Sequence, residues 1–201
     1  MKNVVIATKN AGKAKEFKAM FGEIGYTVTT LLDHPEMPDI EETGTTFAEN
    51  SALKATETAK QLQTIAIADD SGLAVVALNG APGVYSARYA GEAKDDQKNR
   101  AKLLQALAET PDEERQAAFH CVLTVSDATG HVLKQYTGIW NGTITHEERG
   151  DNGFGYDSIF YVPSEQKTAA ELTSETKDHL SHRAQALQQL AKDLREGELK
   201  L

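Results

Sequence analysis

The sequence predicts an α/β protein with a mixed β-sheet and helices on its faces. Strand-like and helix-like segments alternate at both ends of the chain, whereas the middle contains successive strand-like segments. Of the 201 residues, 40% are hydrophobic and 25% are charged, which is typical of a folded soluble protein and not of a disordered chain. This length is sufficient to bury a core, and we expect one domain over residues 1–201.

The first part of the chain has the pattern strand, helix, strand. Residues 4–8 are a short run rich in β-branched side chains, which predicts a strand. Apolar residues then recur at the spacing of one helix face, and Gly25 ends this helix. Residues 26–32 predict a second strand. The apolar stripe of the helix comprises Phe17, Met20, Phe21 and Ile24.

An acidic loop with two prolines follows over residues 33–44 and leads into a second helix. Thr46 and Glu49 form a capping-box pattern at the start of this helix, which we expect over residues 47–62. Two short strands are then expected at residues 65–68 and 73–78, with a sharp turn after the two aspartates that follow the first of them.

The second half predicts two more helices and a group of strands. Asp95 or Asp96 can cap a helix that ends before Pro111. A last helix is expected from about Ser181 to Glu196. The strands are expected at residues 117–126, 132–140, 142–146 and 158–162, the first two as a hairpin.

Charge and composition exclude several classes of partner. The net charge of −9 argues against nucleic acid, because nucleic-acid affinity depends on Lys and Arg that neutralise phosphates. We also expect no membrane, since no apolar run approaches the ~20 residues that span a bilayer and no signal peptide is evident. Cys121, the single cysteine, permits no disulfide within the chain, which indicates a reducing cytoplasm, and it is more typical of a small core residue than of a catalytic thiol.

Residues 8–13, with the sequence TKNAGK, lie where the first strand passes into the first helix. Free backbone N–H groups and the helix dipole favour an anion at such a position. Asn10 tolerates the turn, Gly12 allows close approach of a backbone, and Lys13 adds a positive charge. The segment is not a Walker A motif, and a helix start flanked by lysines is also typical of an ordinary solvated turn.

Acidic residues from two segments predict a magnesium site. Glu41 and Glu42 end the acidic loop, whereas Asp69 and Asp70 follow a buried strand. Because adjacent side chains of a strand point to opposite faces, the two aspartates need not share one role: one can hold a turn while the other faces a cleft. A structural cap is the alternative interpretation, but carboxylates from two segments suit Mg²⁺, which also binds phosphate oxygens.

Asn50 and Lys54 lie four residues apart on the helix over residues 47–62 and therefore share a face. A polar stripe of this kind is commonly the solvated side of a helix. The functional interpretation is that Lys54 reaches a phosphate and that Asn50 orients a neighbouring group.

The sequence GFGYD at residues 153–157 is a glycine-rich loop whose aromatic residues can stack on a nucleobase. His182 and Arg183 fall in the first turn of the last helix, where the helix dipole disfavours cations, and such a placement indicates function. Arg183 can alternatively pair with Glu175 or Asp178. Together with the carboxylates, the lysines and the helix-start anion site, the loop predicts a magnesium–nucleotide site.

The chain resembles the RdgB-type inosine/xanthosine triphosphate pyrophosphatases over nearly its whole length. The resemblance departs from the family pattern at Ser51, where alanine is usual, and at Ser158, where proline is common. It rests on blocks that occur in this order: TKNAGK, EETGTTFAEN with Lys54, ADDSGL, GAPGVYSARYAG, FHCVL, GFGYD, VPSEQKTAAEL and SHRAQAL.

The resemblance implies an elongated α/β fold with two lobes around a central cleft, and a homodimer. It implies that magnesium is the cofactor, that Glu41 and Asp70 hold it, and that Asp70 is also the proton acceptor. Glu41 is preferred to Glu42 by the resemblance alone. The implied substrate contacts are Thr8, Lys9, Asn10, Ala11, Gly12 and Lys13 at the triphosphate, Lys54 and Ser71, and Phe154, Gly155, Tyr156, Asp157, Lys177, His182 and Arg183 at the base and adjoining groups.

The implied reaction is the magnesium-dependent hydrolysis of non-canonical purine nucleoside triphosphates (ITP, dITP and XTP) to the monophosphate and pyrophosphate, which removes them from the nucleotide pool. Two alternatives remain open. One is a pyrophosphatase that prefers modified pyrimidine triphosphates. The other is a nucleotide sensor without turnover, against which the presence of all four carboxylates argues.

Overall fold

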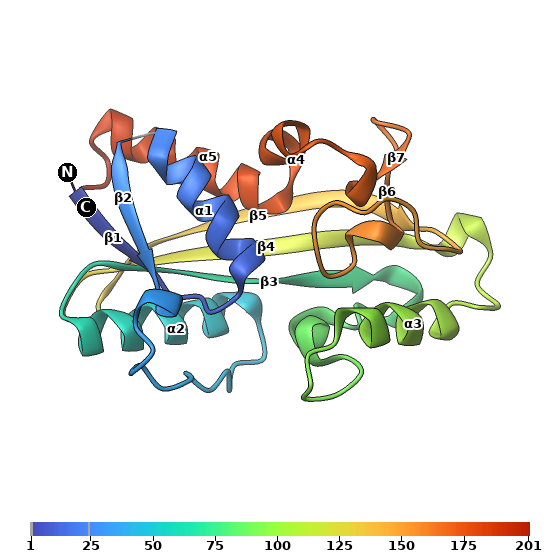
Figure 1. The fold of residues 1–201 in the computed structure, drawn as a ribbon, viewed down its shortest axis with the longest axis horizontal. Helices are drawn as coiled ribbons and strands as arrows, with labels where there is room; N and C mark the ends of the chain where they lie inside the picture. Colours follow the sequence, from blue (N-terminus) through green and yellow to red (C-terminus); the bar gives the residue numbers. More distant parts are fainter. Residues whose placement is uncertain (1, 24) are drawn as a thin grey trace. The chain divides into compact units, whose positions relative to one another are not determined.

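A computed structural model describes residues 2–23 and 25–201, so Ile24 of the predicted apolar stripe lies outside the described residues. The predicted α/β fold with a mixed sheet is confirmed, with the strand order β2-β1-β3-β4-β5-β6-β7 (Figure 1). The strands are β1 (Lys2–Ile6), β2 (Tyr26–Thr30), β3 (Ala66–Val75), β4 (Gln116–Ser126), β5 (Val132–Ile144), β6 (Phe160–Val162) and β7 (Lys167–Thr168). The helices are α1 (Ala11–Glu23), α2 (Phe47–Leu62), α3 (Asp96–Ala106), α4 (Ser174–Leu180) and α5 (His182–Glu196).

The chain forms two compact units, each with its own core. Unit 1 comprises the residues up to 70 together with 121–138 and 183–201, and unit 2 comprises residues 71–120 and 139–182. The long strands β3, β4 and β5 contribute residues to both units.

In unit 1, β1 pairs in parallel with both β2 and β3. Helices α1 and α5 cover one face of these strands and α2 covers the other (Figure 1). The face under α1 and α5 buries Phe17 and Phe21 against Leu187 and Leu190, because the apolar stripes of both helices point toward the sheet. A smaller cluster that contains Ala55 and Ala68 lies under α2.

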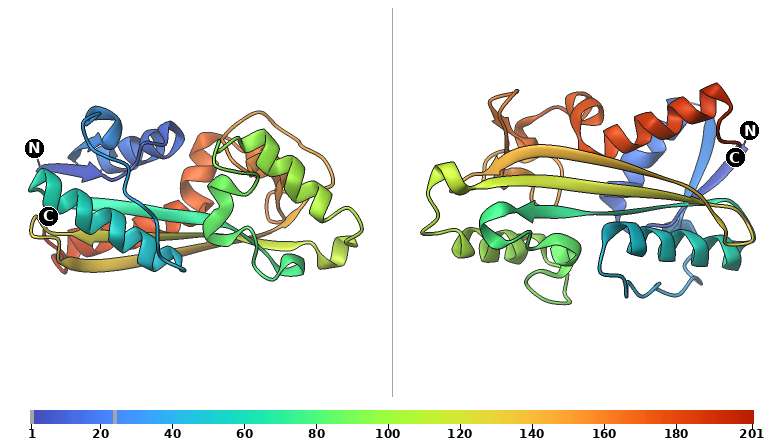
Figure 2. Two further views of the ribbon diagram at one scale, coloured as in Figure 1. Left: turned by 90° about the horizontal axis from the view of Figure 1, so that it is seen from below. Right: turned by 180° about the vertical axis from the view of Figure 1, so that it is seen from behind.

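In unit 2, β6 pairs antiparallel with both β5 and β7. Helices α3 and α4 lie on opposite sides of the strands of this unit (Figure 2). The core gathers aromatic side chains, with Phe119 and Phe160 at a ring-centroid distance of 4.5 Å and Trp140 and Phe160 at 5.3 Å. Both distances fall in the range that aromatic pairs favour.

Several elements agree with the sequence in detail. Helix α2 has the predicted bounds, and Thr46 and Glu49 form its capping box. Asp95, and not Asp96, is the N-cap of α3, where its side chain accepts from the backbone N–H of Lys98. Gly25 has φ +81°, a conformation that glycine adopts without strain where a helix ends.

Two predicted chain breaks do not occur. Residues 66–75 form one strand, so Asp69 and Asp70 lie within β3 and not before a turn. Aspartate has a low intrinsic propensity for strands. Here both carboxylates have charged partners from other elements, which a propensity based on sequence does not take into account. Residues 132–144 likewise form one strand through Gly142, where a Cβ would come within 2.4 Å of the backbone oxygen of Tyr161 in β6. This glycine therefore serves close strand packing and not a break.

The sequence missed two short elements. Helix α4 has seven residues and no apolar stripe, and β7 has two residues. Both are too short to generate a periodic pattern. Among the residues that the structure describes, no helix is both long and apolar enough to cross a membrane.

Candidate active site

The predicted site residues form two groups, one in each unit. The group in unit 2 comprises Ser71, the loop over residues 154–157, Lys177 and His182. The group in unit 1 comprises residues 8–13, Glu41, Glu42, Lys54, Asp69, Asp70 and Arg183.

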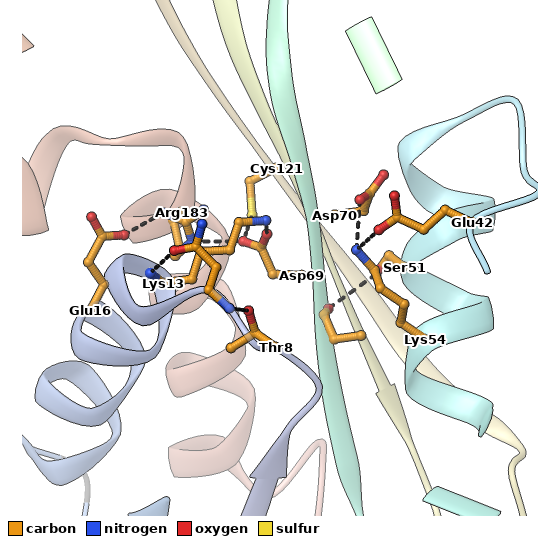
Figure 3. Close-up of polar contacts among 12 residues, drawn as sticks. Thr8, Lys13, Glu16, Glu42, Ser51, Lys54, Asp69, Asp70, Cys121 and Arg183 are labelled. Carbon is orange, nitrogen blue, oxygen red and sulfur yellow. Dashed lines mark hydrogen bonds and ion pairs between the residues drawn. The ribbon is translucent and has the colours of Figure 1, made fainter. Parts of the chain in front are cut away.

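Asp69 and Asp70 point to opposite sides of β3 (Figure 3). Asp69 faces Lys13 and Arg183, on α1 and α5, whereas Asp70 faces Lys54 on α2. The expectation that the two aspartates need not share a role therefore agrees with the geometry. One strand places a carboxylate into each of two separate ionic clusters.

The cluster around Asp70 contains two carboxylates and one lysine. The ammonium of Lys54 donates to Asp70 Oδ1 at 2.8 Å and to Glu42 Oε1 at 2.7 Å. Asp70 is 6% exposed, and its second oxygen, Oδ2, is buried and has no hydrogen-bond partner among the described residues. A buried carboxylate oxygen in this state is one that a ligand is expected to satisfy.

The ionisation of this cluster follows from burial and charge. Burial raises the pKa of Asp70, and the repulsion by Glu42 adds to this, so that both outweigh the attraction of Lys54 and of Lys13. Burial alone would lower the pKa of Lys54, but the charges of Asp70 and Glu42 overcome it and raise that pKa. Lys54 therefore stays charged, while Asp70 is a stronger proton acceptor than an ordinary aspartate.

The structure gives Glu41 and Glu42 different environments, which the sequence alone does not distinguish. Glu42 is half-buried and shares Lys54 with Asp70, whereas Glu41 is exposed. Glu42 thus lies in the same ionic cluster as Asp70, and the preference for Glu41, which comes from the resemblance alone, stays a prediction. Within the described residues there is no group of three or more His, Cys, Asp or Glu side chains that could hold a metal ion, so a metal here would have few protein ligands.

Helix α2 is fixed against the loop that carries Glu42 and against β3. The Oδ1 atom of Asn50 accepts from the backbone N–H of Gly44 at 2.8 Å, which ties the loop to the first turn of α2. One helical turn before Lys54, the hydroxyl of Ser51 lies 3.2 Å from the backbone oxygen of Ala68 and 2.6 Å from Thr124 Oγ1. These buried contacts hold Lys54 in register with Asp70.

Asp69 and Arg183 form the buried centre of the second cluster, and Lys13 is partly buried beside them. The Asp69 carboxylate pairs with Lys13 through Oδ1 and with Arg183 Nε through Oδ2 at 2.7 Å, and it accepts from the thiol of Cys121 at 3.3 Å. Arg183 also pairs with Glu16 of α1. Burial acts against ionisation of Asp69, but Arg183 and Lys13 outweigh it and hold its pKa well below the usual range.

These contacts bear on two interpretations made from the sequence. Arg183 pairs with Glu16 and Asp69, which are distant from it in sequence. Cys121 is a core residue whose pKa is raised well above the usual range by burial and by Asp69, so it is not an activated thiol.

The segment over residues 8–13 forms the start of α1. Asn10 caps the helix by accepting from the backbone N–H of Lys13 at 3.0 Å, and it donates its own N–H to Thr8 Oγ1 at 3.2 Å. Ala11 and Gly12 are the first residues of α1. Lys9 instead turns to the acidic loop over residues 33–44, where its ammonium binds Asp39 at 2.8 Å.

In unit 2, Asp157 organises the glycine-rich loop. Its Oδ2 atom accepts from the backbone N–H of Phe154 at 3.0 Å and from Lys177 Nζ at 2.7 Å. The Lys177 ammonium lies 5.0 Å from the centre of the Phe154 ring, a cation–π distance. Tyr156 is different, because its hydroxyl donates to the backbone oxygen of Ser86 at 2.8 Å and its ring belongs to the core. Lys177 and Phe154 thus lie close together, whereas Tyr156 anchors the loop to the core.

His182 is buried in unit 2, where its ring stacks on Phe119 at 4.8 Å with an interplanar angle of 10°. Ser71 lies in β3 directly after Asp70 and is half-buried. Gly155 has φ +61°, and its backbone is held by side chains of α3.

Sequence reasoning missed several residues that hold the candidate site. Glu16, Ser51 and Thr124 contact the site residues only after folding, and no local pattern marks them. Asp96 and Arg100 carried a usable signal, since they are four residues apart and therefore share a face of α3.

Comparison with known proteins places this chain in a family. Residues 4–193 match the model of the Ham1 family. A protein of Halalkalibacterium halodurans named dITP/XTP pyrophosphatase is 52% identical, over 96% of this chain and 98% of that protein. A protein of Shigella flexneri with the same name is 53% identical, over 98% of this chain and 100% of that protein. The solved structure of the Staphylococcus aureus Ham1 protein matches with a TM-score of 0.85 and 47% identity, over 98% of this chain and 100% of that chain. The chain therefore belongs to the Ham1 family.

Proposed function

We propose that this protein hydrolyses non-canonical purine nucleoside triphosphates, namely ITP, dITP and XTP, to the monophosphate and pyrophosphate, and so removes them from the nucleotide pool. The names of the relatives from Halalkalibacterium halodurans and Shigella flexneri, dITP/XTP pyrophosphatase, support this activity. The observation that carries the proposal is the buried carboxylate of Asp70, which has a raised pKa and an oxygen without a hydrogen-bond partner among the described residues.

Asp70 is the proton acceptor of the proposed reaction. A water molecule attacks the α-phosphorus in line with the departing pyrophosphate. Asp70 takes a proton from this water as the O–P bond forms, and the bond from the α-phosphorus to the bridging oxygen breaks. The raised pKa of Asp70 suits this role, because a general base is most effective when its pKa approaches the working pH.

Positive groups at the start of α1 and on α2 bind the triphosphate. The backbone N–H groups at the start of α1 and the side chains of Lys13 and Lys54 supply charge for the phosphate oxygens. Lys13 and Lys54 are already oriented by Asp69 and Asp70, so little side-chain entropy is lost when a phosphate arrives.

The carboxylates fit a magnesium ion. Mg²⁺ is commonly held by one or two carboxylates together with substrate phosphates and water, and it needs no cage of protein ligands. Glu42 and Asp70 supply two carboxylates that converge on Lys54, and Asp70 Oδ2 is the oxygen without a partner among the residues that the structure describes. We propose these two residues as the magnesium ligands, with Glu42 in place of the Glu41 that the resemblance implies. When bound, the ion would neutralise charge on the phosphate oxygens.

In this proposal the glycine-rich loop and Lys177 bind the base. Phe154 offers a ring for stacking and Lys177 offers a donor beside it. Hypoxanthine and xanthine carry a 6-oxo acceptor, whereas adenine carries a 6-amino donor that would leave a protein donor unpaired. A site that hydrogen-bonds its substrate can reject such an analogue by ~10⁴-fold or more. Guanine keeps the 6-oxo group, so its rejection rests on the 2-amino position.

The test is a pyrophosphate-release assay with the triphosphates of inosine, deoxyinosine, xanthosine, guanosine and adenosine and with a modified pyrimidine triphosphate, each with and without magnesium. We expect the first three to be preferred and magnesium to be required. Equal rates for all purines would contradict the specificity, a faster pyrimidine substrate would favour the first alternative, and binding without release would favour a sensor.

Asp70→Asn supplies the control for the chemistry. Its amide cannot accept the proton, so turnover of ITP should fall by about 10²-fold or more while the circular dichroism spectrum stays unchanged. A variant that hydrolyses ITP at nearly the wild-type rate would remove Asp70 from the mechanism.

The proposal extends to a homodimer in a reducing cytoplasm. The free thiol of Cys121 suits such a compartment. Exposed apolar side chains are available for self-association in unit 2, where Val76 is 68% exposed and Tyr85 is 59% exposed. Light scattering coupled to size-exclusion chromatography measures the mass directly, and a monomer across the micromolar range would contradict the dimer.

A further inference from the structure

The backbone of Gly155 in the glycine-rich loop is hydrogen-bonded on both sides by one helix. Its N–H donates to Asp96 Oδ2 at 2.8 Å, and its carbonyl oxygen accepts from Arg100 Nη1 at 2.9 Å. Asp96 and Arg100 lie four residues apart on α3 and therefore on one face of it. The Asp96 carboxylate thus accepts from the N–H of Gly155, while the Arg100 guanidinium donates to the carbonyl oxygen of the same residue.

Arg100 is itself held in place. Its Nε donates to Glu148 Oε2 at 2.8 Å, and the same carboxylate oxygen accepts from the hydroxyl of Ser158 at 3.0 Å. Arg100 thus joins α3 to Glu148 and, through Glu148, to Ser158, the residue that directly follows the loop. Because the guanidinium is planar and presents its donors in a fixed fork, it can bind Glu148 and Gly155 together, which a lysine cannot do in the same way.

The loop is fixed on its inner side by Asp157, which accepts from Phe154 and Lys177. The fit there is close: a Cβ on Gly153 would come within 2.0 Å of Asp157 Oδ2. On the α3 side the neighbours are polar, around a cavity of about 360 Å³ lined by Asp96, Arg100, Glu148, Phe154 and Gly155 among others. Because the residues that line this cavity are mostly polar, we expect the conformation of the loop on that side to depend on hydrogen bonds.

We propose that Asp96 and Arg100 are positioning residues that hold the glycine-rich loop so that the Phe154 ring and the Lys177 ammonium meet the nucleobase. This inference rests on the proposed function, because it assigns the loop to the base. It adds a specific expectation: loss of the α3 contacts weakens interactions that involve the base and leaves interactions with the phosphates unchanged. Neither side chain touches the reacting atoms.

Arg100→Met tests the proposal, because methionine keeps the apolar stem and removes both hydrogen bonds. We expect the KM for ITP to rise about tenfold, which corresponds to about 1.4 kcal/mol, while kcat changes less than twofold. The inhibition constant of inorganic tripolyphosphate, which has no base, should stay within twofold of wild type. Lys98→Met is the matched control, since it removes one positive charge from α3 at an exposed residue that pairs with the nearby Asp95.

A second pair of variants guards against a folding artefact. Asp96→Asn retains an oxygen that can accept from Gly155, whereas Asp96→Ala does not, so the KM for ITP should rise in the alanine variant and recover in the asparagine variant. Parallel rises in KM and in the tripolyphosphate inhibition constant, or an unchanged KM in both Arg100→Met and Asp96→Ala, would overturn the proposal.

Failure of the proposed function is visible separately, as wild-type protein that releases no pyrophosphate from ITP. The positioning role is then read from calorimetric binding of inosine monophosphate. Binding that is about tenfold weaker in Arg100→Met than in wild type supports it, and equal binding, or none to wild type, overturns it.

Discussion

Lys54 and Asp70 are joined by a hydrogen bond of 2.8 Å between Nζ and Oδ1, and the same ammonium binds Glu42 at 2.7 Å. One cation therefore balances two carboxylates, of which Asp70 carries a raised pKa because of burial and the nearby charge of Glu42. The charge state of the candidate site depends on this lysine. Its removal should therefore change the pH dependence of activity as well as remove a salt bridge.

Lys54→Met should lower kcat/KM for ITP by about 10²-fold, since a charge for the phosphates is lost. It should also shift the acid side of the pH profile. Lys54 lowers the pKa of Asp70, so without it the pKa of that carboxylate rises further and activity begins to fall at a higher pH. The pH dependence of kcat/KM measures this shift. Lys60→Met on the same helix, where the lysine is exposed, is the control, and an unmoved acid limb would contradict the coupling.

Glu42→Gln and Glu41→Gln distinguish the two candidate magnesium ligands. Glu42 shares Lys54 with Asp70 whereas Glu41 is exposed, so only Glu42→Gln should raise the magnesium concentration for half-maximal activity, by about tenfold or more. Magnesium titrations at saturating ITP provide the measurement. The reverse ranking would restore Glu41 as the ligand, and no effect in either variant would remove this loop from the metal site.

Asp69→Asn should destabilise the protein by about 3–5 kcal/mol at pH 7, because Arg183 and Lys13 lose their shared buried counter-charge. The pKa of Asp69 is depressed in the folded protein, so the stabilisation is present above the unfolded value of about 4 and is lost as the pH falls below it. Urea unfolding between pH 7 and pH 3 should show the difference between wild type and variant shrinking toward acid. A difference that stays constant over this range would contradict the linkage.

Ser51→Ala should reduce the unfolding free energy by about 1–2 kcal/mol, since a buried hydroxyl that contacts Ala68 and Thr124 is lost. Thr124→Val removes the facing hydroxyl with little change of shape. The double variant should be less destabilised than the sum of the two single variants, because neither hydroxyl is then left without its partner. Chemical denaturation of the four proteins gives the coupling, and strict additivity would show that the two hydroxyls do not interact.

The sequence predicted best those features that local chemistry determines. The capping box of α2, the positive φ of Gly25 after α1 and the start of the last helix at His182 each depend on residues within a few positions of one another. The continuity of β3 was missed because it depends on ion pairs from α1, α2 and α5, which reach Asp69 and Asp70 only in the folded chain.

The same distinction applies to the site. The residue types pointed to anion and metal chemistry, and alternation along a strand correctly allowed different roles for Asp69 and Asp70. The choice between Glu41 and Glu42 depends on where an irregular loop turns toward Lys54, and no period in the sequence encodes that. The contact of Asp96 and Arg100 with Gly155 joins segments about sixty residues apart and is likewise a product of tertiary structure.

Because Asp69 and Asp70 are adjacent in β3, a shift of this strand by one residue should have different effects in its two directions. Most of β3 is buried on both faces, so hydrophobic alternation does little to resist a slip by one residue. A shift in one direction would put Asp70 opposite Arg183 and Ser71 opposite Lys54, preserving the interior salt bridge but abolishing hydrolysis. The opposite shift would place Asp69 opposite Lys54 and Ala68 opposite Arg183. This would keep a carboxylate in the proposed catalytic position but would remove the buried salt bridge that stabilises the fold. A one-residue insertion or deletion in this segment should therefore reduce either the hydrolytic activity or the stability of the fold, depending on the direction of the shift.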